Sequence, residues 1–247
     1  MAALPLKAAE KDTPCFEMRT YFVAEGKLDD LHARFRDHTC ALFEKHGIRN
    51  IGYWVPQDNP ERKLIYLLAY PSREAREKSW KAFGADPDWK KASKDSEKNG
   101  RLVTNVISRF LVPTDYSPEV KPSIEQPSRT FELRTYTASK GKLAALDERF
   151  RSHTLKLFEK HGMQNFGYWH LMPDQKGGEA ADKTLIYILA HKSKEAAAES
   201  FAAFRKDPEW IKVKEDSETK AGGSLTEGGM AGVQSVFMNP TDYSQTK

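Results

Sequence analysis

Short runs in which apolar and polar residues alternate are followed by longer runs with helical spacing, and the whole pattern occurs twice. Alternation predicts a first strand at residues 16–21 and again at 131–136. Apolar residues three and four apart then predict a long helix in each copy, which ends at the His-Gly pairs 46–47 and 161–162. Each copy is therefore predicted to run strand, helix, strand, strand, helix, strand.

Residues that favour helix starts support this order. Ser72 and Ser193 are placed to cap the second long helix. Asp-Pro at 86–87 and at 207–208 predicts a short extra helix after it. The later strands are expected at 48–55, 64–70 and 103–112 in the first copy, and at 163–170, 185–191 and 233–238 in the second.

The two copies match block by block. Phe16 and Phe131 start matching six-residue blocks 115 positions apart, and Pro113 and Pro240 start matching Pro-Thr-Asp-Tyr blocks 127 positions apart. A period of this length is one small domain rather than a solenoid unit. We therefore predict a tail at 1–14, domains at 15–117 and 130–247, and a Pro-rich linker at 118–129.

This order of elements predicts an α+β fold built from two ferredoxin-like βαββαβ repeats. Such a repeat carries its helices on one face of its sheet, so the other face needs a cover. The second copy is the obvious cover. An extended linker would let the two sheets pack face to face as an α/β barrel within one chain.

Composition narrows the function classes. The 247 residues have a net charge of +4, but Lys and Arg are interleaved with Asp and Glu, which is typical of solvated helix faces and does not favour nucleic-acid binding. No stretch approaches the ~20 apolar residues of a membrane span. Cys15 and Cys40 correspond to Thr130 and Leu155, so we expect no disulfide. The first residues leave open both a cytoplasmic protein and one exported after removal of a signal.

Several blocks of the chain resemble the NIPSNAP family. They are Phe-Glu-Leu-Arg-Thr-Tyr, Gly-Lys-Leu, Leu-Phe-Glu-Lys-His-Gly, Gly-Tyr-Trp and Asp-Pro-Glu-Trp, within 16–116 and 131–243. The resemblance implies a ferredoxin-like, dimeric α/β-barrel fold, in a superfamily that includes cofactor-free monooxygenases, haem-degrading enzymes and small isomerases. It implies neither a settled reaction nor catalytic residues, so the candidate site has to be argued from the side chains.

The first strand of each copy carries charge on one face. The residues are Glu17, Arg19 and Tyr21, repeated as Glu132, Arg134 and Tyr136. Because a helix-covered face favours apolar groups, we expect these side chains on the open face of the sheet, inside the barrel. They would form either a structural Glu–Arg network or a cavity in which Arg binds an anion while Glu and Tyr handle protons.

The second strand adds candidates that we expect to share one face. They are Asn50, Gly52 and Trp54, repeated as Asn165, Gly167 and Trp169. An Asn inside a strand is unfavourable by propensity, so it either binds a ligand or caps a backbone group. The Trp is either core or a stacking platform, and Tyr66 and Tyr187 of the third strand would join the same lining.

One histidine in each first helix, His38 and His153, lies three residues after a Phe of the apolar stripe. Each would be a hydrogen-bonded residue at the core edge, a general base or a haem ligand. The sequence has no cluster with convincing zinc spacing and no phosphate-loop or nucleophile motif. We therefore predict no cofactor and no metal.

Two insertions distinguish the second copy, at 171–184 and 221–232, and we expect them at one end of the barrel as an asymmetric lid. The predicted function is a small-molecule-binding or assembly module. The alternative is a cofactor-light enzyme, monooxygenase-like or isomerase-like, that uses the cavity between the sheets. An open cavity lined by the charged residues would favour a ligand-based function, and closed Glu–Arg pairs would favour assembly. Expected partners are a small-molecule ligand and further copies of the chain.

Overall fold

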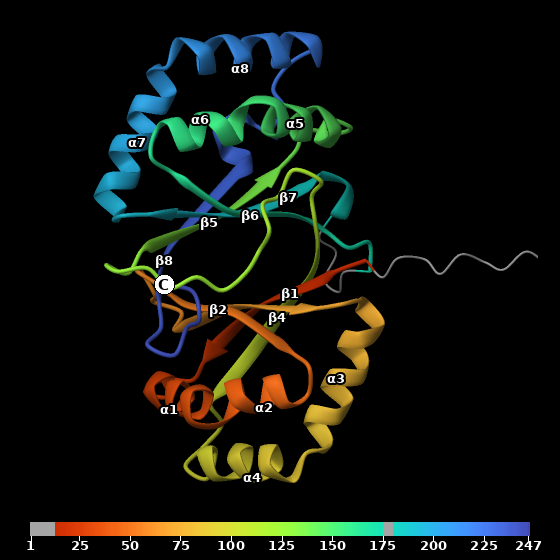
Figure 1. Cartoon of the computed structure of the whole chain (residues 1–247), viewed down its shortest axis with the longest axis vertical. Coiled ribbons are helices and arrows are strands. Elements are labelled where there is room, and N and C mark those ends of the chain that lie inside the picture. Colours follow the sequence, from red (N-terminus) through yellow and green to blue (C-terminus); the bar gives the residue numbers. More distant parts are fainter. Residues whose placement is uncertain (1–12, 175–179) are drawn as a thin grey trace, which may run out of the picture.

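The computed structural model describes residues 13–174 and 180–247 and has two similar halves stacked along its long axis (Figure 1). In each half the strands lie toward the middle of the molecule and the helices lie outside them. The first half contains β1 (Cys15–Val23), α1 (Leu28–Arg34), α2 (Cys40–Lys45), β2 (Arg49–Pro56), β3 (Lys63–Tyr70), α3 (Arg73–Ala85), α4 (Pro87–Ser96) and β4 (Val103–Pro113). The second half contains β5 (Thr130–Thr137), α5 (Leu143–Arg149), α6 (Leu155–Lys160), β6 (Gln164–Leu171), β7 (Thr184–His191), α7 (Lys194–Lys206), α8 (Pro208–Lys220) and β8 (Val233–Pro240).

A single closed barrel joins the two halves. Its strand order is β1-β3-β2-β8-β5-β7-β6-β4, and neighbouring strands are antiparallel. The halves meet where Trp54 of β2 lies opposite Pro240 of β8, and where Leu111 of β4 lies opposite Leu171 of β6. The joins between the halves are short, with three residue pairs each between β2 and β8 and between β4 and β6, and they close the ring of strands. The prediction of a mixed α/β fold with a closed barrel in one chain is confirmed.

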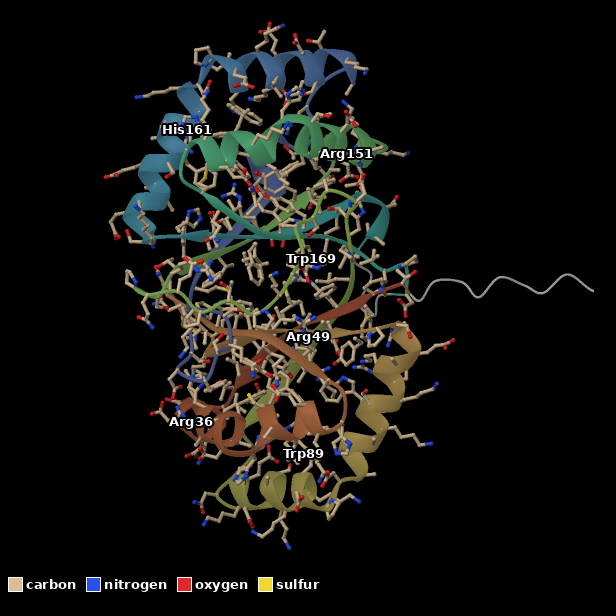
Figure 2. All side chains as sticks on the ribbon, in the orientation of Figure 1. Arg36, Arg49, Trp89, Arg151, His161 and Trp169 are labelled. Carbon is tan, nitrogen blue, oxygen red and sulfur yellow. The ribbon has the colours of Figure 1, made fainter. Side chains whose placement is uncertain are left out.

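The inner and outer faces of the barrel form separate cores. The inner cluster includes Phe16, Met18, Trp54, Phe131 and Trp169. The outer clusters, which lie under the helices, include Phe35, Phe43, Tyr66, Phe150 and Phe158. Trp169 lies between the two helix layers, at mid-height in Figure 2. Because large apolar side chains fill both faces, neither face of the sheet is the open one that the sequence analysis assumed.

The predicted helix ends are present in both halves. In the first half Ser72 caps α3, Asp86 caps α4 ahead of Pro87, and Gly47 ends the first helical run with φ of 71°. The second half repeats these features at Ser193, Asp207 and Gly162. Only glycine takes such a positive φ without a steric penalty, which explains the two His-Gly pairs.

The first helical run departs from the predicted 3.6-residue period. Between α1 and α2, the residues Phe35–Thr39 form a π-helical turn, in which the backbone N–H of Cys40 donates to the carbonyl of Phe35. The second half has the same turn at Phe150–Thr154. A π turn contains one extra residue, so it rotates the buried face of everything that follows.

The Pro-Thr-Asp-Tyr blocks hold the two halves together, and we call this arrangement the reciprocal clamp. Asp242, after β8, accepts hydrogen bonds of 2.6 and 2.8 Å from Arg36 of the first half. The neighbouring Tyr243 ring is stacked on Phe35 at 6.1 Å and 11°. The second half is clamped in the same way by Asp115, Arg151, Tyr116 and Phe150. Arg36 and Arg151 lie in opposite helix layers in Figure 2.

The linker and the C-terminus add to this connection. Val120 of the linker packs into the inner cluster of the barrel. The backbone of Lys247 exchanges hydrogen bonds of 2.9 and 3.1 Å with Ser123 and Glu125. The linker is therefore part of the packed structure rather than a free spacer.

Replacing Gly167 by Ala is expected to destabilise the protein by about 1–3 kcal/mol. A Cβ at this position would lie 2.5 Å from the Trp169 ring and 2.7 Å from Val120, and both neighbours are buried. Gly84 is the matched control, because a Cβ there meets nothing within 4 Å inside α3. Gly84→Ala should stabilise by about 0.5–1 kcal/mol. Urea unfolding of both variants checks the opposite signs, and a neutral Gly167→Ala would contradict this packing.

Candidate functional site

The charged residues of β1 point toward the helices and not into the barrel, so this part of the sequence prediction is wrong. Phe16 and Met18 occupy the inner cluster. Glu17 lies on the other face, where Arg76 and Trp80 of α3 reach it. The error has a physical reason: the helix layer supplies its own counter-charge, so an ionised group can be buried beneath it.

Glu17 is the centre of a closed network. Its side chain is fully buried and accepts hydrogen bonds from Arg19 at 2.6 Å, from Arg76 at 2.7 and 2.9 Å, and from Ser108 at 2.5 Å. Burial raises the pKa of Glu17, but the hydrogen bonds and charges of Arg76 and Arg19 outweigh it and lower the pKa to about 2. The carboxylate is therefore held ionised and is a poor proton acceptor at neutral pH.

The corresponding network in the second half has a different composition. Glu132 is paired with Arg134 and accepts from Ser235 at 2.5 Å, and His191 Nε2 lies 3.1 Å from its second oxygen. Burial raises the pKa of Glu132, and the His191 hydrogen bond and the Arg134 charge outweigh it, so the pKa is lowered. Ala197 stands where the first half has Arg76. Each carboxylate is thus neutralised by different groups.

Tyr21 and Tyr136 lie beside these pairs as expected, but on the helix side. Tyr66 and Tyr187, which were expected in one lining with Trp54 and Trp169, lie on the helix side as well. Arg19 Nε donates to the Tyr66 hydroxyl at 2.9 Å, and Arg134 Nε donates to the Tyr187 hydroxyl at 2.9 Å. Tyr21 lies under the Arg19 guanidinium, 5.5 Å from its carbon. Tyr136 accepts from Arg134 at 3.2 Å. The structure therefore brings Glu, Arg and Tyr together as predicted, but as mutually satisfied groups rather than as the lining of an open cavity.

Asn50 and Trp54 do not share a face, in contrast to the prediction. The β2–β3 register shifts between Asn50 and Gly52, so the strand contains a bulge that turns Asn50 toward the helices. There Asn50 Nδ2 donates to the carbonyl of Cys40 at 2.9 Å, just after the π turn. Asn165 does the same for Leu155 at 3.1 Å. These contacts match the interpretation of this Asn as a cap for a backbone group.

Trp54 and Trp169 lie inside the barrel and are fully buried. Neither indole N–H finds a hydrogen-bond acceptor among the residues that the structure describes. Trp54 packs against Phe131 at 5.4 Å, and Trp169 packs against Phe16 at 5.8 Å. These contacts make both rings part of the core that joins the two halves.

His38 and His153 are exposed, whereas the sequence placed them on or beside the sheet-facing stripe. The π turns explain the difference. With one extra residue in the turn, the buried positions after Phe35 are Thr39 and Phe43, and His38 rotates outward. His153 follows the same geometry in the second half. Neither histidine contacts the Glu–Arg networks in any described interaction.

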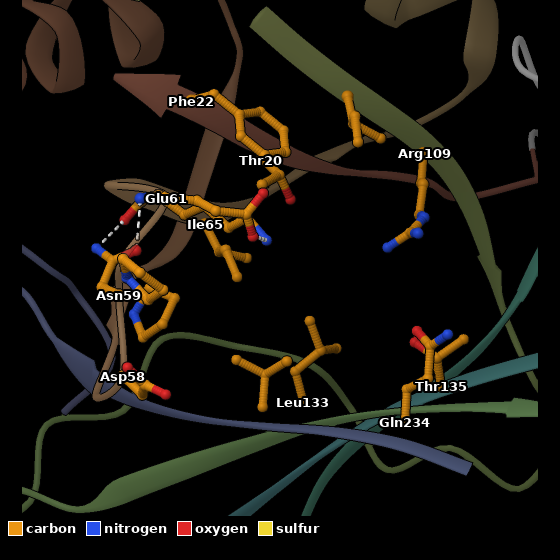
Figure 3. Close-up of a pocket in the computed structure, with 15 residues that line it drawn as sticks. Thr20, Phe22, Asp58, Asn59, Glu61, Ile65, Arg109, Leu133, Thr135 and Gln234 are labelled. Atoms are coloured by element: carbon orange, nitrogen blue, oxygen red, sulfur yellow. Dashed lines mark hydrogen bonds and ion pairs between the residues drawn. The ribbon is translucent and has the colours of Figure 1, made fainter. Parts of the chain in front are cut away.

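An open cavity does exist, but other residues line it (Figure 3). It has a volume of about 240 Å³ and lies at the end of the barrel where β1 and β5 finish. We call it the mouth cavity. Its lining includes Thr20, Ile65, Arg109, Leu133, Thr135 and Gln234, together with residues of the β2–β3 loop. In Figure 3, Arg109 points across the cavity toward Thr135 and Gln234 of the other half.

The mouth cavity breaks the repeat of the two halves. Thr20 and Thr135 are equivalent positions of β1 and β5. Arg109, however, lies opposite Met18 in β4, and the equivalent position opposite Leu133 in β8 is Val236. Arg109 is not among the residues that both copies share, on which the predicted site was based. The available signal was an Arg at an inward-facing position of β4, two residues before the buried Leu111.

The described parts of the two insertions of the second half meet at one end of the barrel, as expected. Ala138 pairs with Thr226 across an isolated bridge, and Lys183 lies 3.2 Å from Glu227. Residues 175–179 of the first insertion lie outside the described residues, so the lid itself stays a prediction.

Within the described ranges, no group of three or more His, Cys, Asp or Glu side chains is arranged to hold a metal ion. The helices in those ranges lack the length and apolar composition needed to cross a membrane.

Comparisons with known proteins give a family and a fold. The NIPSNAP family model matches residues 16–118 and 131–245, and a search among curated proteins gives no match. An uncharacterised NIPSNAP-like domain protein from Burkholderia xenovorans is 22% identical over 47% of this chain and 97% of its own, with a TM-score of 0.40. A putative monooxygenase from Lactobacillus acidophilus is 11% identical over 95% and 98%, with a TM-score of 0.54. A second putative monooxygenase, from Fusobacterium nucleatum, is 12% identical over 94% of each chain, with a TM-score of 0.55. The latter two likenesses concern the fold alone.

Proposed function

This chain belongs to the NIPSNAP family, and from that premise we propose that it is a small-molecule-binding protein whose ligand occupies the mouth cavity. The observation that carries the proposal is the cavity itself, which is bounded by both halves and combines apolar walls with a few polar groups. Ligand sites usually have this composition. Its volume of about 240 Å³ is below the ~300–1,000 Å³ of drug-sized pockets, so the ligand is small.

The lining defines the chemical class of the ligand. Ile65, Leu133 and Val236 supply apolar contact. Arg109 and the amide of Gln234 supply hydrogen-bond donors, and the hydroxyls of Thr20 and Thr135 supply both donors and acceptors. A molecule with a short apolar body and a polar or anionic end matches this set best.

The domain plan is part of the same proposal. We infer that residues 15–117 and 130–247 are ferredoxin-like repeats, joined by 118–129, and that their sheets pack as an intrachain version of the dimeric α/β barrel. The βαββαβ order of elements and the antiparallel order β4-β1-β3-β2 within one half support this. In this arrangement the assembly role and the binding role coincide, because the cavity exists only where the two halves meet.

The enzyme alternative, of monooxygenase or isomerase type, has less support. Glu17 and Glu132 are each paired with an arginine and do not line the mouth cavity. His38 and His153 are exposed on the helix layers. The similarity to two putative monooxygenases extends to the fold only.

Native mass spectrometry of the freshly purified full-length chain tests the binding proposal. We expect a copurified small molecule in the wild type and its loss in Val236→Phe, which fills the cavity without changing charge. Val106→Phe is the matched control. Val106 lies on the face of β4 opposite to that of Arg109, which lines the cavity, and it is 39% exposed. An adduct that persists in Val236→Phe, or a wild type with an unmodified mass under gentle desolvation, would argue against the mouth cavity as the site. The intact mass also reports whether further copies associate.

A further inference from the structure

The join between β4 and β6 covers only one end of β4. Strand β4 pairs with β1 along nearly its whole length, from Val103 to Leu111, but β6 pairs with it only from Leu111 to Pro113. Among the residues that the structure describes, no strand pairs with the other side of residues 105–108. We call residues 105–108 the β4 edge.

The backbone around the β4 edge shows which groups face outward. The Phe110 carbonyl accepts a hydrogen bond of 2.8 Å from the backbone of Met172, on the side away from β1. Alternate residues of a strand turn their backbone groups to the same side, so Ser108 and Val106 also turn their N–H and C=O groups away from β1. The Val106 N–H agrees with this direction, because it donates to the exposed side chain of Asn105 at 2.9 Å and not to a strand. The β4 edge therefore offers the backbone groups of two residues for pairing.

The side chains of the β4 edge do not protect it from pairing. Its sequence, Asn-Val-Ile-Ser, contains no charge and no proline. Val106 is 39% exposed and Ile107 is 40% exposed. Natural proteins usually protect a free edge with lysine, proline or a covering segment, because such an edge otherwise pairs with another chain. We therefore expect the β4 edge to have a partner.

The second half has a different edge at the equivalent place. Val106 and Ile107 correspond to Val233 and Gln234, because the two pairs lie opposite matching residues of β1 and β5. Strand β8 begins only at Val233, directly after a 3-10 turn at Gly229–Gly232, and the residue at the Ile107 position is polar. Within the described ranges each chain thus carries one apolar edge of this kind. Pairing through a single edge stops at two copies and does not grow into a fibre.

We propose that two copies of this chain associate by pairing their β4 edges antiparallel, across a twofold axis at Ile107. The structure selects this register. Thr104 is left unpaired by a bulge in the pairing with β1, and the Phe110 carbonyl is already engaged. Only a pair centred on Ile107 uses both Val106 and Ser108 of each copy, with each Val106 opposite the other copy's Ser108.

A second copy matches the β4 edge for reasons of symmetry and charge. An antiparallel pair of identical stretches is complementary to itself, and it places Ile107 opposite Ile107. Arg109 of one copy comes opposite Asn105 of the other, so like charges do not face each other. The added strand continues the sheet of the barrel where β6 stops. Ile107 also lines the mouth cavity, but this inference does not rest on the function proposed for that cavity.

Sedimentation velocity of the full-length protein over a range of concentrations tests the proposal. We expect a monomer–dimer equilibrium with a dissociation constant of about 1–100 μM, because the paired stretch is short. Val106→Lys should weaken association by about tenfold or more, since it brings two lysines onto the same face of the paired strands. Val233→Lys is the matched control at the equivalent position of β8 and should associate like the wild type.

Three outcomes of this experiment would overturn the proposal. They are a wild type that stays monomeric, a Val106→Lys variant that associates as well as the wild type, and growth beyond the dimer. Val236→Phe, which fills the mouth cavity, should associate like the wild type. A loss of association in that variant would show that the dimer depends on the cavity and not on the β4 edge.

Hydrogen exchange locates the interface independently. The Ser108 amide points away from β1, so it should exchange slowly in the associated wild type and faster in Val106→Lys. Val106→Pro is a second variant, because it removes an N–H that the pairing with β1 does not use, and it should also prevent association. Thermal unfolding followed by circular dichroism checks that both variants are folded. Equal exchange of the Ser108 amide in dimeric wild type and in Val106→Lys would place the interface elsewhere and refute the proposal.

Discussion

Replacing Glu17 by Gln is expected to destabilise the protein by about 3–5 kcal/mol, the range seen when one partner of a buried ion pair is removed. Glu17 is fully buried and is the shared counter-ion of Arg19 and Arg76. The amide keeps the size of the side chain but removes the negative charge. Two guanidinium groups would then remain in a largely dehydrated site without their carboxylate. Urea unfolding followed by circular dichroism measures the loss.

Glu132→Gln is the matched control within the same chain. Glu132 neutralises Arg134, and its second neighbour is His191 rather than a second arginine. Only one permanent positive charge is therefore left unpaired. The loss of stability should be smaller than for Glu17→Gln. A larger loss would show that the number of buried arginines left unpaired does not determine how much stability is lost.

The same network predicts how stability depends on pH. The pKa of Glu17 is lowered from 4.5 to about 2 in the folded protein. The unfolded chain therefore binds a proton first as the pH falls, and the stabilisation is present above about pH 4.5 and is lost between about pH 4.5 and about pH 2. Stability curves of the wild type and Glu17→Gln should converge across this window. Parallel curves would contradict a strongly lowered pKa.

The second large effect concerns the first half alone: we expect residues 1–117 not to form a stable folded monomer. Without the second half, the inner side chains of β1–β4 lose their cover, among them Phe16, Met18 and Trp54. Each large apolar side chain contributes about 1.5–3 kcal/mol on burial, and a whole domain has only about 5–15 kcal/mol of net stability. The fragment should pair with itself or aggregate in light-scattering chromatography.

Coexpression of 1–117 with 118–247 is the control for this experiment. The reciprocal clamp and the β2–β8 and β4–β6 pairings are all noncovalent, so the two pieces should form a one-to-one complex. A clean folded monomer of 1–117 would show that the barrel interior is not needed for the stability of one half.

The sequence was sufficient for the order of elements and for the helix ends, because these depend on local chemistry. Ser72, Asp86 and Gly47 act through their own backbone neighbourhood, so their roles were predictable. Which face of β1 meets the helices was not predictable. Alternation separates Glu17 from Phe16, but it does not say which face meets the helices when both faces are buried. The deciding partner, Arg76, is 59 residues away and has no counterpart in the second copy.

Two further errors arise from irregular backbone that hydrophobic periodicity does not report. The π turn moves His38 to the surface, and the bulge in β2 separates Asn50 from Trp54. The two irregularities are linked by a hydrogen bond, because the side chain of Asn50 donates to the Cys40 carbonyl at the end of the π turn. The candidate site was missed for a different reason. Arg109 and Gln234 differ between the copies, and they form a cavity only after the barrel closes.

The covalent link between the two halves has a consequence for stoichiometry. A barrel made from two identical chains must present equivalent groups on both sides of its axis, so a ligand at the mouth meets the same surroundings in two opposite orientations. Here one side carries Arg109 and the other carries Val236. A molecule with unlike ends can therefore be held in one orientation only, as a single copy for each chain.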